Sequence, residues 1–265
     1  GIYPLLADET CWFLALDFDG PSWAEDAAAL LGACRELDVP VALERSRSGN
    51  GGHAWVFFAE PLPAAWARRL GSLLLTRAME SRPEIGLSSY DRLFPSQDTL
   101  PQGGFGNLIA LPLQRRARDL GNAVFVDERF VPYEDQFGYL SSLQRLTRER
   151  VETLVDEAEA RDQVMGVRVV PEEDWAAEPW RRLQAAPTHL AAKQTALHEG
   201  LPTSLRVVLA DQLYVPKSDL VPALRNRIIR LAAFQNPEFY RAQAIHLPVF
   251  GLARVIGCAE DYPQH

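Results

Sequence analysis

Residues 11–20, CWFLALDFDG, combine an unbroken apolar run with two acids. The run over residues 12–16 is typical of a strand that is buried on both faces. Side chains alternate across a strand, so Asp17 and Asp19 should point the same way while Phe18 points back into the core. The sequence therefore predicts a buried strand that ends in two carboxylates on one face.

Two carboxylates at such short range repel each other unless something positive lies between them. Hard divalent cations such as Mg²⁺ and Mn²⁺ prefer oxygen ligands and often offset this repulsion between carboxylates in proteins. The alternative is a strand end that runs into a turn, with Asp17 and Asp19 both in solvent. The motifs that follow in the chain favour the metal site.

Composition places the chain among soluble globular proteins. Its 265 residues are 47% hydrophobic and 23% charged, enough for one large core or two modest ones. No apolar run approaches the ~20 residues that span a bilayer, and the N-terminus lacks a signal-peptide pattern. Three distant cysteines, Cys11, Cys34 and Cys258, predict reduced thiols rather than a zinc site or disulfides. We expect a cytoplasmic protein without a membrane partner.

Charge is unevenly distributed along the chain. The net charge of −8 argues against a protein that coats DNA without regard to sequence. Residues 1–40 carry one base and eight acids, whereas residues 41–131 carry eleven bases and nine acids. An acidic first segment beside a weakly basic middle fits a metal site that faces phosphates.

Predicted strands and helices alternate through the first half of the chain. Their order, β-α-β-β-α-β-β, is the ferredoxin-like (split βαβ) pattern of an α+β fold. We expect strands over 11–20, 39–44, 53–59, 107–113 and 123–127, and helices over 22–38, 62–79, 136–160 and 220–234. Residues 80–106 read as an irregular stretch, too long for a mere connection, and we expect it to carry function.

A polar, glycine-rich turn, R45-S-R-S-G-N-G-G-H53, lies between the second and third predicted strands. Glycines leave backbone N–H groups free to approach a phosphate, Ser48 adds a hydroxyl, and Arg45 and Arg47 add charge. The turn is not a P-loop, since no Lys-Ser/Thr follows and no helix begins. The alternative is a polar hairpin in which His53 caps a strand. Beside two acids, the turn predicts a nucleotide site.

The long irregular stretch supplies candidates for a third acid. Asp91 and Asp98 both lie in it, among Ser and Pro residues. Either one would complete a site of three carboxylates. The alternative for each is an exposed loop acid that caps a turn.

These motifs resemble the three-motif signature of archaeo-eukaryotic primases and primase-polymerases: D-h-D on a strand, S-G-x-G-x-H opening a strand, then a further Asp. The primase domain of the TOTE conflict systems of bacteria and their mobile elements is similar over essentially the entire chain. The segments that carry this similarity are WFLALDFDG, CRELDVPVALERSRSGNGGHAWVFF, RLGSLLLTRAMESRPEIGLSSYDRLFPSQDTLPQGGFGNLIALPLQ and GNAVFVDERFVPYEDQ. LPTSLRVVLADQLYV and LRNRIIRLAAFQNPEFYRAQA resemble the segment that leads into a superfamily 2 helicase.

The resemblance implies a core of two packed RRM-like (ferredoxin-like) halves. We assign the primase-polymerase core to residues 1–140, a helical connecting region to 141–200 and a mainly helical C-terminal segment to 201–265. Members of the family carry cysteine-rich sequence before the primase, and helicase and nuclease parts after it. We therefore expect this sequence to be a piece excised from a longer chain.

The resemblance also implies template-directed nucleotidyl transfer, as primer synthesis or primer extension. Its substrates would be nucleoside triphosphates on a single-stranded or primed DNA template, and its partners the helicase and nuclease parts of the same system. Two Mg²⁺ or Mn²⁺ ions would be bound by Asp17, Asp19 and Asp91, with Asp98 as the alternative third ligand.

The residues that match the nucleotide-binding motif lie mostly in the glycine-rich turn. They are Arg45, Arg47, Ser48, Gly49, Asn50, Gly51 and His53, together with Gln97 and Asn107 at polar positions further on. The turn is one residue shorter than the S-G-x-x-G-x-H of eukaryotic primase catalytic subunits.

Two other functions use the same residues. A non-catalytic nucleic-acid-binding module of a larger helicase would carry a vestigial site, but the acids and the S…H motif are intact. A metal-dependent nuclease would use the acids and leave the glycine-rich turn without a role.

Overall fold

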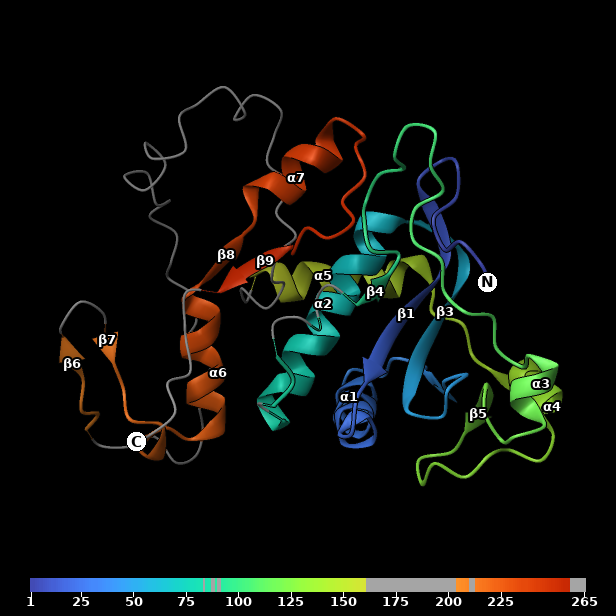
Figure 1. Cartoon of the computed structure of the whole chain (residues 1–265), viewed down its shortest axis with the longest axis horizontal. Helices are drawn as coiled ribbons and strands as arrows, with labels where there is room; N and C mark the ends of the chain where they lie inside the picture. The colour runs from blue at the N-terminus through green and yellow to red at the C-terminus, as the bar shows by residue number, and fades with distance from the viewer. Residues whose placement is uncertain (83, 87–88, 90–91, 161–203, 210–212, 258–265) are drawn as a thin grey trace.

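A computed structural model describes residues 1–82, 84–86, 89, 92–160, 204–209 and 213–257 (Figure 1). Its main feature is a five-stranded antiparallel sheet of order β4-β1-β3-β2-β5. The strands are β1 (Thr10–Asp19), β2 (Ala42–Arg45), β3 (Gly51–Pro63), β4 (Leu93–Phe94) and β5 (Val124–Val126). Helix α1 (Trp23–Glu36) joins β1 to β2, and helix α2 (Ala64–Ser81) joins β3 to β4. This order confirms the predicted ferredoxin-like α+β unit, which β5 extends beside β2.

The main core lies between one face of this sheet and helices α1, α2 and α5 (Arg148–Ala160) (Figure 1). Strand β1 contributes Leu14, Leu16 and Phe18, all buried, and each stabilises the fold by about 1.5–3 kcal/mol through burial. Helix α2 fills the centre of this layer, with most of its side chains buried. The sheet is therefore fixed on this side by apolar packing.

The opposite face of the sheet carries a smaller apolar cluster. It contains Phe13, Ala15, Trp55 and Phe125, which pack with Ile109. Because side chains alternate along β1, Asp17 and Asp19 continue the row that Phe13 and Ala15 begin. The two acids thus share one face, as predicted, at the end of a buried strand.

The edge strand β4 differs from the prediction. The sequence predicts a strand over residues 107–113, but within this range only Ile109 makes a β-bridge, with Ile2. The fourth strand is instead Leu93–Phe94, inside the stretch predicted to be irregular. Two residues are too few to show a period of alternation, and Pro112 cannot donate a ladder hydrogen bond in the expected segment.

The helix predicted over residues 136–160 is two helices, α4 (Gln136–Ser142) and α5. Between them Leu146 is buried and pairs in parallel with Phe58 of β3. The Thr147 hydroxyl then accepts a hydrogen bond from the Arg150 N–H and caps the start of α5. Two short elements precede this region: α3 (Arg115–Arg118) and β5.

Part of the described C-terminal segment packs on α2. Its helix α6 (Pro222–Leu231) falls within the predicted 220–234, and its Asn226 side chain donates a hydrogen bond to the Met79 carbonyl of α2. Its other elements are β6 (Val208–Leu209), β7 (Leu213–Tyr214), η4 (Lys217–Asp219), β8 (Ala233–Gln235), α7 (Pro237–Ala244) and β9 (Val255–Gly257). None of the helices in the described ranges has the length and apolar character that a membrane crossing requires.

Candidate active site

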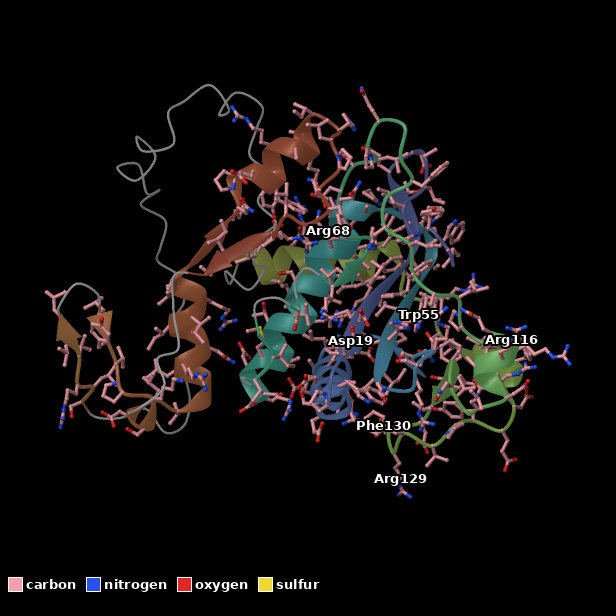
Figure 2. The ribbon with its side chains drawn as sticks, viewed as in Figure 1. Asp19, Trp55, Arg68, Arg116, Arg129 and Phe130 are labelled. Atoms are coloured by element: carbon pink, nitrogen blue, oxygen red, sulfur yellow. The ribbon has the colours of Figure 1, made fainter. Side chains whose placement is uncertain are left out.

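The two motifs singled out in the sequence meet on the second face of the sheet. Strands β1 and β3 pair so that Asp17 lies opposite His53 and Asp19 lies opposite Gly51. The His53 Nε2 atom is 3.6 Å from Asp17 Oδ1. Figure 2 shows Asp19 at the end of β1, to the left of Trp55 of β3 and slightly below it in the view. The strand end and the glycine-rich turn therefore form one site.

A buried acid that the sequence reading missed, Glu44, stands behind His53. Glu44 of β2 lies opposite His53 in the β2–β3 register and is only 1% exposed. Its Oε2 lies 2.9 Å from His53 Nδ1 and accepts a hydrogen bond of 2.9 Å from Trp55 Nε1. In the sequence Glu44 is the last residue of an apolar predicted strand, directly before the turn that ends at His53, and no pattern marks it as more than an ordinary strand end.

A second missed residue, Arg92, forms ion pairs with both acids. The guanidinium Nη1 donates a hydrogen bond to Asp19 Oδ2 and lies 3.5 Å from Asp17 Oδ2. The Arg92 carbonyl also accepts a hydrogen bond of 3.1 Å from the Asp17 N–H, which continues the β1–β4 pairing. The sequence predicts a divalent cation beside these carboxylates, and in the described chain the Arg92 guanidinium is the positive group that lies near both.

Burial and charge shift the protonation of this group. Burial raises the pKa of Asp17 above its ordinary value; Asp19 adds to the rise, whereas His53 and Arg92 oppose it. Burial by itself would lower the pKa of His53, but its hydrogen bond to Glu44 and the nearby acid charges outweigh burial and raise it. The site therefore favours a protonated imidazole beside the acids.

The turn between β2 and β3 is shaped by close approaches. A Cβ on Gly51 would lie 2.6 Å from the Phe18 carbonyl oxygen, and one on Gly52 would lie 2.6 Å from the Trp23 ring. Gly49 has a φ of 80°, a conformation that favours glycine. Gly51 thus lets the turn lie directly against the end of β1, and Gly52 lets it lie against Trp23 at the start of α1.

The polar side chains of the turn divide into two sets. Ser48 and Arg47 are exposed, and the Ser48 hydroxyl accepts a hydrogen bond of 3.2 Å from the Asn50 N–H, which orders the turn. Arg45 instead donates to the carbonyls of Gly121 and Phe130, at 3.0 and 2.7 Å. Arg45 thus ties the turn to the segments on either side of β5.

The structure distinguishes the two candidates for the third acid. Asp91 lies outside the described residues, but the next residue, Arg92, is hydrogen-bonded beside Asp17. Asp98 lies toward the other end of β1, where the nearby Leu100 N–H donates to Glu9 Oε1 at 3.1 Å. The structure therefore does not bring Asp98 to the Asp17–Asp19 pair.

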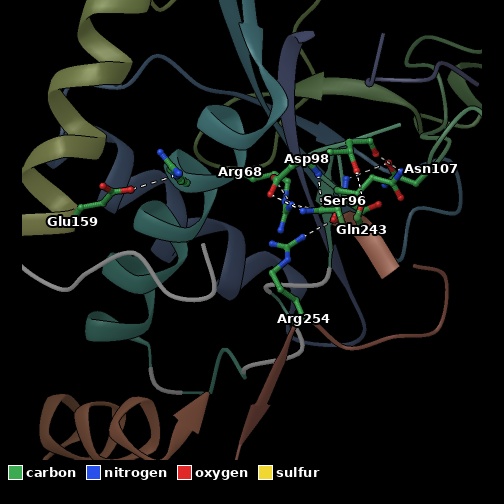
Figure 3. Close-up of polar contacts among 10 residues, drawn as sticks. Arg68, Ser96, Asp98, Asn107, Glu159, Gln243 and Arg254 are labelled. Carbon is green, nitrogen blue, oxygen red and sulfur yellow. Dashed lines mark hydrogen bonds and ion pairs between the residues drawn. The ribbon is translucent and has the colours of Figure 1, made fainter. Parts of the chain in front are cut away.

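Asp98 belongs to a buried polar network, shown in Figure 3. It pairs with Arg68 of α2, which is fully buried, and with Gln243 of α7, whose Nε2 donates to Oδ2 at 2.9 Å. Arg254 donates from Nη2 to the Ser96 carbonyl at 2.8 Å. This network joins α2, the loop after β4 and the C-terminal segment.

Gln97 and Asn107 hold the same loop. The buried Gln97 donates from Nε2 to the Thr99 carbonyl at 2.7 Å. Asn107 Oδ1 accepts from the Ser96 N–H at 3.2 Å, and its Nδ2 donates to the Leu93 carbonyl at 3.4 Å. These bonds fix the course of the chain after β4.

The donor chemistry of the site fits a hard divalent ion, although the described residues contain no cluster of three or more His, Cys, Asp or Glu arranged for a metal. Asp17 and Asp19 present carboxylate oxygens on one face, and the Arg92 guanidinium acts there as a stand-in cation. Cys11 and Cys34 are free and buried, and burial raises the pKa of each to about 12, so they offer no thiolate ligand.

Comparison with known proteins identifies a family. The model for the TOTE conflict system, Archaeo-Eukaryotic Primase domain, matches residues 1–154. This range runs from before β1 into α5 and includes Asp17, Asp19, Glu44, His53 and Arg92. No match to a curated protein is found.

Proposed function

The chain belongs to the family of archaeo-eukaryotic primase domains of TOTE conflict systems, and from that premise we propose that it catalyses template-directed nucleotidyl transfer. The substrates are nucleoside triphosphates and a single-stranded or primed DNA template. The reaction is primer synthesis, primer extension or both, within a defence-related system whose helicase and nuclease parts are its partners.

One observation supports this proposal most strongly. The acid motif and the turn motif, far apart in sequence, meet across adjacent strands, with His53 Nε2 3.6 Å from Asp17 Oδ1. Nucleotidyl transfer needs carboxylates for metal and donors for phosphate side by side. A nuclease would need the carboxylates alone.

In this proposal the acids bind metal ions and the residues of the turn bind phosphate. Asp17, Asp19 and Asp91 would hold the divalent ions, and those ions would supply activation of the 3′-hydroxyl and charge stabilisation of the leaving pyrophosphate. His53, Ser48, Arg47 and the backbone N–H groups of the turn, including those of Gly49, Asn50 and Gly51, hold the β- and γ-phosphates.

In this proposal the Arg92 side chain exchanges its partners when ligands bind. Its side chain is 45% exposed and that of Asp19 is 54% exposed, so the pair contributes only about 0–1 kcal/mol. Its guanidinium is therefore free to leave the carboxylates when ions bind, and to donate to the triphosphate that arrives with them.

The test is an extension assay with labelled nucleotides on primed and unprimed templates, run with Mg²⁺ and with Mn²⁺. We expect product longer than the primer, or new short product, that depends on Asp17 and Asp19. Cleavage of the template without triphosphate would favour the nuclease instead. Binding of template without either reaction would favour the non-catalytic module.

A further inference from the structure

Three side chains form a row across three neighbouring strands. Glu44 of β2, His53 of β3 and Asp17 of β1 occupy matched register positions on the same face of the sheet. His53 lies in the middle: its Nδ1 is 2.9 Å from Glu44 Oε2, and its Nε2 is 3.6 Å from Asp17 Oδ1. The two ring nitrogens therefore face different surroundings, one the interior and the other the acid pair.

Glu44 is oriented as an acceptor. Its Oε2 receives the N–H of Trp55, and an indole nitrogen can only donate. The same oxygen lies 2.9 Å from His53 Nδ1, and an ionised carboxylate can only accept, so this contact favours the tautomer with its hydrogen on Nδ1. The Trp55 ring also stands edge-on to the imidazole, with centroids 6.0 Å apart and an interplanar angle of 85°. Glu44 and Trp55 together leave the His53 ring one orientation.

Burying a carboxylate is costly unless it is hydrogen-bonded and paired, so a glutamate at 1% exposure calls for a reason. Histidines that act through one ring nitrogen are commonly oriented by an acceptor on the other. In that arrangement Glu44 never touches the substrate. It acts by fixing which nitrogen of His53 is presented.

We propose that Glu44 is a positioning residue for His53: by accepting the Nδ1 hydrogen it directs Nε2 at the bound triphosphate. This inference rests on the proposed function, since it assumes that His53 contacts phosphate. Glu44 would thereby raise the affinity for triphosphate without contacting the ligand, because it acts through His53.

The test is a double-mutant cycle read out by calorimetric binding of a non-hydrolysable nucleoside triphosphate. Glu44→Met and His53→Ala should each weaken binding roughly tenfold or more, the scale of a hydrogen bond to a charged group. The double variant should bind no more weakly than His53→Ala alone, because Glu44 acts through His53. Glu44→Gln keeps an acceptor oxygen and should recover most of the affinity.

A matched control removes a carboxylate elsewhere. Glu128 makes an exposed ion pair with Arg35, so Glu128→Gln should leave triphosphate binding unchanged. If Glu44→Met weakens binding as much without His53 as with it, the positioning role is overturned. If His53→Ala binds triphosphate normally, the proposed phosphate role of His53 fails first and takes this inference with it.

A spectroscopic measurement needs no Glu44 variant. Nitrogen NMR of ¹⁵N-histidine-labelled protein at alkaline pH, where the imidazole is neutral, reports which ring nitrogen is protonated. The His53 signals are assigned by their loss in His53→Gln. We expect the hydrogen on Nδ1. A hydrogen on Nε2 with a bare Nδ1 would overturn the proposal even if Glu44→Met fails to fold.

Discussion

Two clusters of aspartate and arginine lie toward opposite ends of β1, and they differ in exposure rather than in residue type. Asp17, Asp19 and Arg92 meet at the open end, where the Asp19 and Arg92 side chains are 54% and 45% exposed. Asp98 and Arg68 meet in the interior, at 18% and 0% exposure. An exposed pair can exchange its partner for a ligand at little cost, whereas a buried pair cannot.

The buried cluster is also more fully tied to its surroundings. Asp98 accepts from Gln243, its own N–H donates to Gln243 Oε1 at 2.8 Å, and Arg68 and Arg254 both lie 5.6 Å from the centre of the Phe239 ring. These bonds join the matched family domain to residues 233–257. An Asp–Arg pair therefore indicates a binding site only when solvent and ligand can reach it.

The largest expected effect is on catalysis at the open cluster. Asp17→Asn and Asp19→Asn should each reduce nucleotidyl transfer by roughly 10³-fold or more, since the ions depend on shared ligands and charge stabilisation dominates such reactions. The rate of primer extension per folded molecule measures this. Retained activity in both variants would refute the assignment of the site.

The second effect is on stability at the buried cluster. Asp98→Asn should lower the free energy of unfolding by roughly 3 kcal/mol, because it leaves the fully buried Arg68 charge without its partner. Urea titration measures the loss, and extension by the folded fraction should stay close to that of the wild type. If Asp98→Asn abolishes extension while its stability is unchanged, the roles of the two clusters have been exchanged.

A smaller effect is expected at Arg92, whose guanidinium pairs with the two carboxylates. Arg92→Gln should tighten Mn²⁺ binding to the nucleotide-free protein by about two- to fivefold, because an exposed competing ion pair of ~0.5–1 kcal/mol is removed. Calorimetry at low ionic strength measures it, and the gain should shrink as salt is added. Weaker Mn²⁺ binding would mean that Arg92 builds the site instead of occupying it.

The smallest effect concerns pH. Because the pKa of His53 is raised in the fold, its contribution to stability is present below its ordinary value of 6.5 and is lost as pH rises through the folded pKa. In metal-free protein, His53→Gln should therefore lose most stability under mildly acidic conditions and approach the wild type as pH rises. Denaturant titrations across this range measure it; a gap that widens with pH would contradict the direction.

The fold and part of the site follow from sequence because they rest on local pattern. The apolar run ending in Asp17 and Asp19 indicates the strand β1, and the glycines before His53 indicate a turn between two strands, so the sequence predicts that the acids and the turn form one site. The strand order then follows from the β-α-β-β-α-β connections. The order of motifs and connections in the chain is enough for these conclusions.

The roles of Glu44, Arg92 and Asp98 could not be predicted from the sequence, because they depend on tertiary contacts. Glu44 looks like an ordinary strand end until its register opposite His53 is known. Arg92 and Asp98 lie in one loop, and only the two-residue strand β4 decides that the first reaches Asp17 while the second turns toward Arg68 and Gln243. A strand that short leaves no periodic signal.

The most direct test of the distinction between the clusters is a thermal melt with and without Mn²⁺ plus a non-hydrolysable nucleoside triphosphate. Ligands of the native state raise its melting temperature by mass action. We expect a rise for the wild type, no rise for Asp17→Asn, and a rise from a lower baseline for Asp98→Asn. A rise that survives in Asp17→Asn and disappears in Asp98→Asn would contradict the assignment of ligand binding to the exposed cluster.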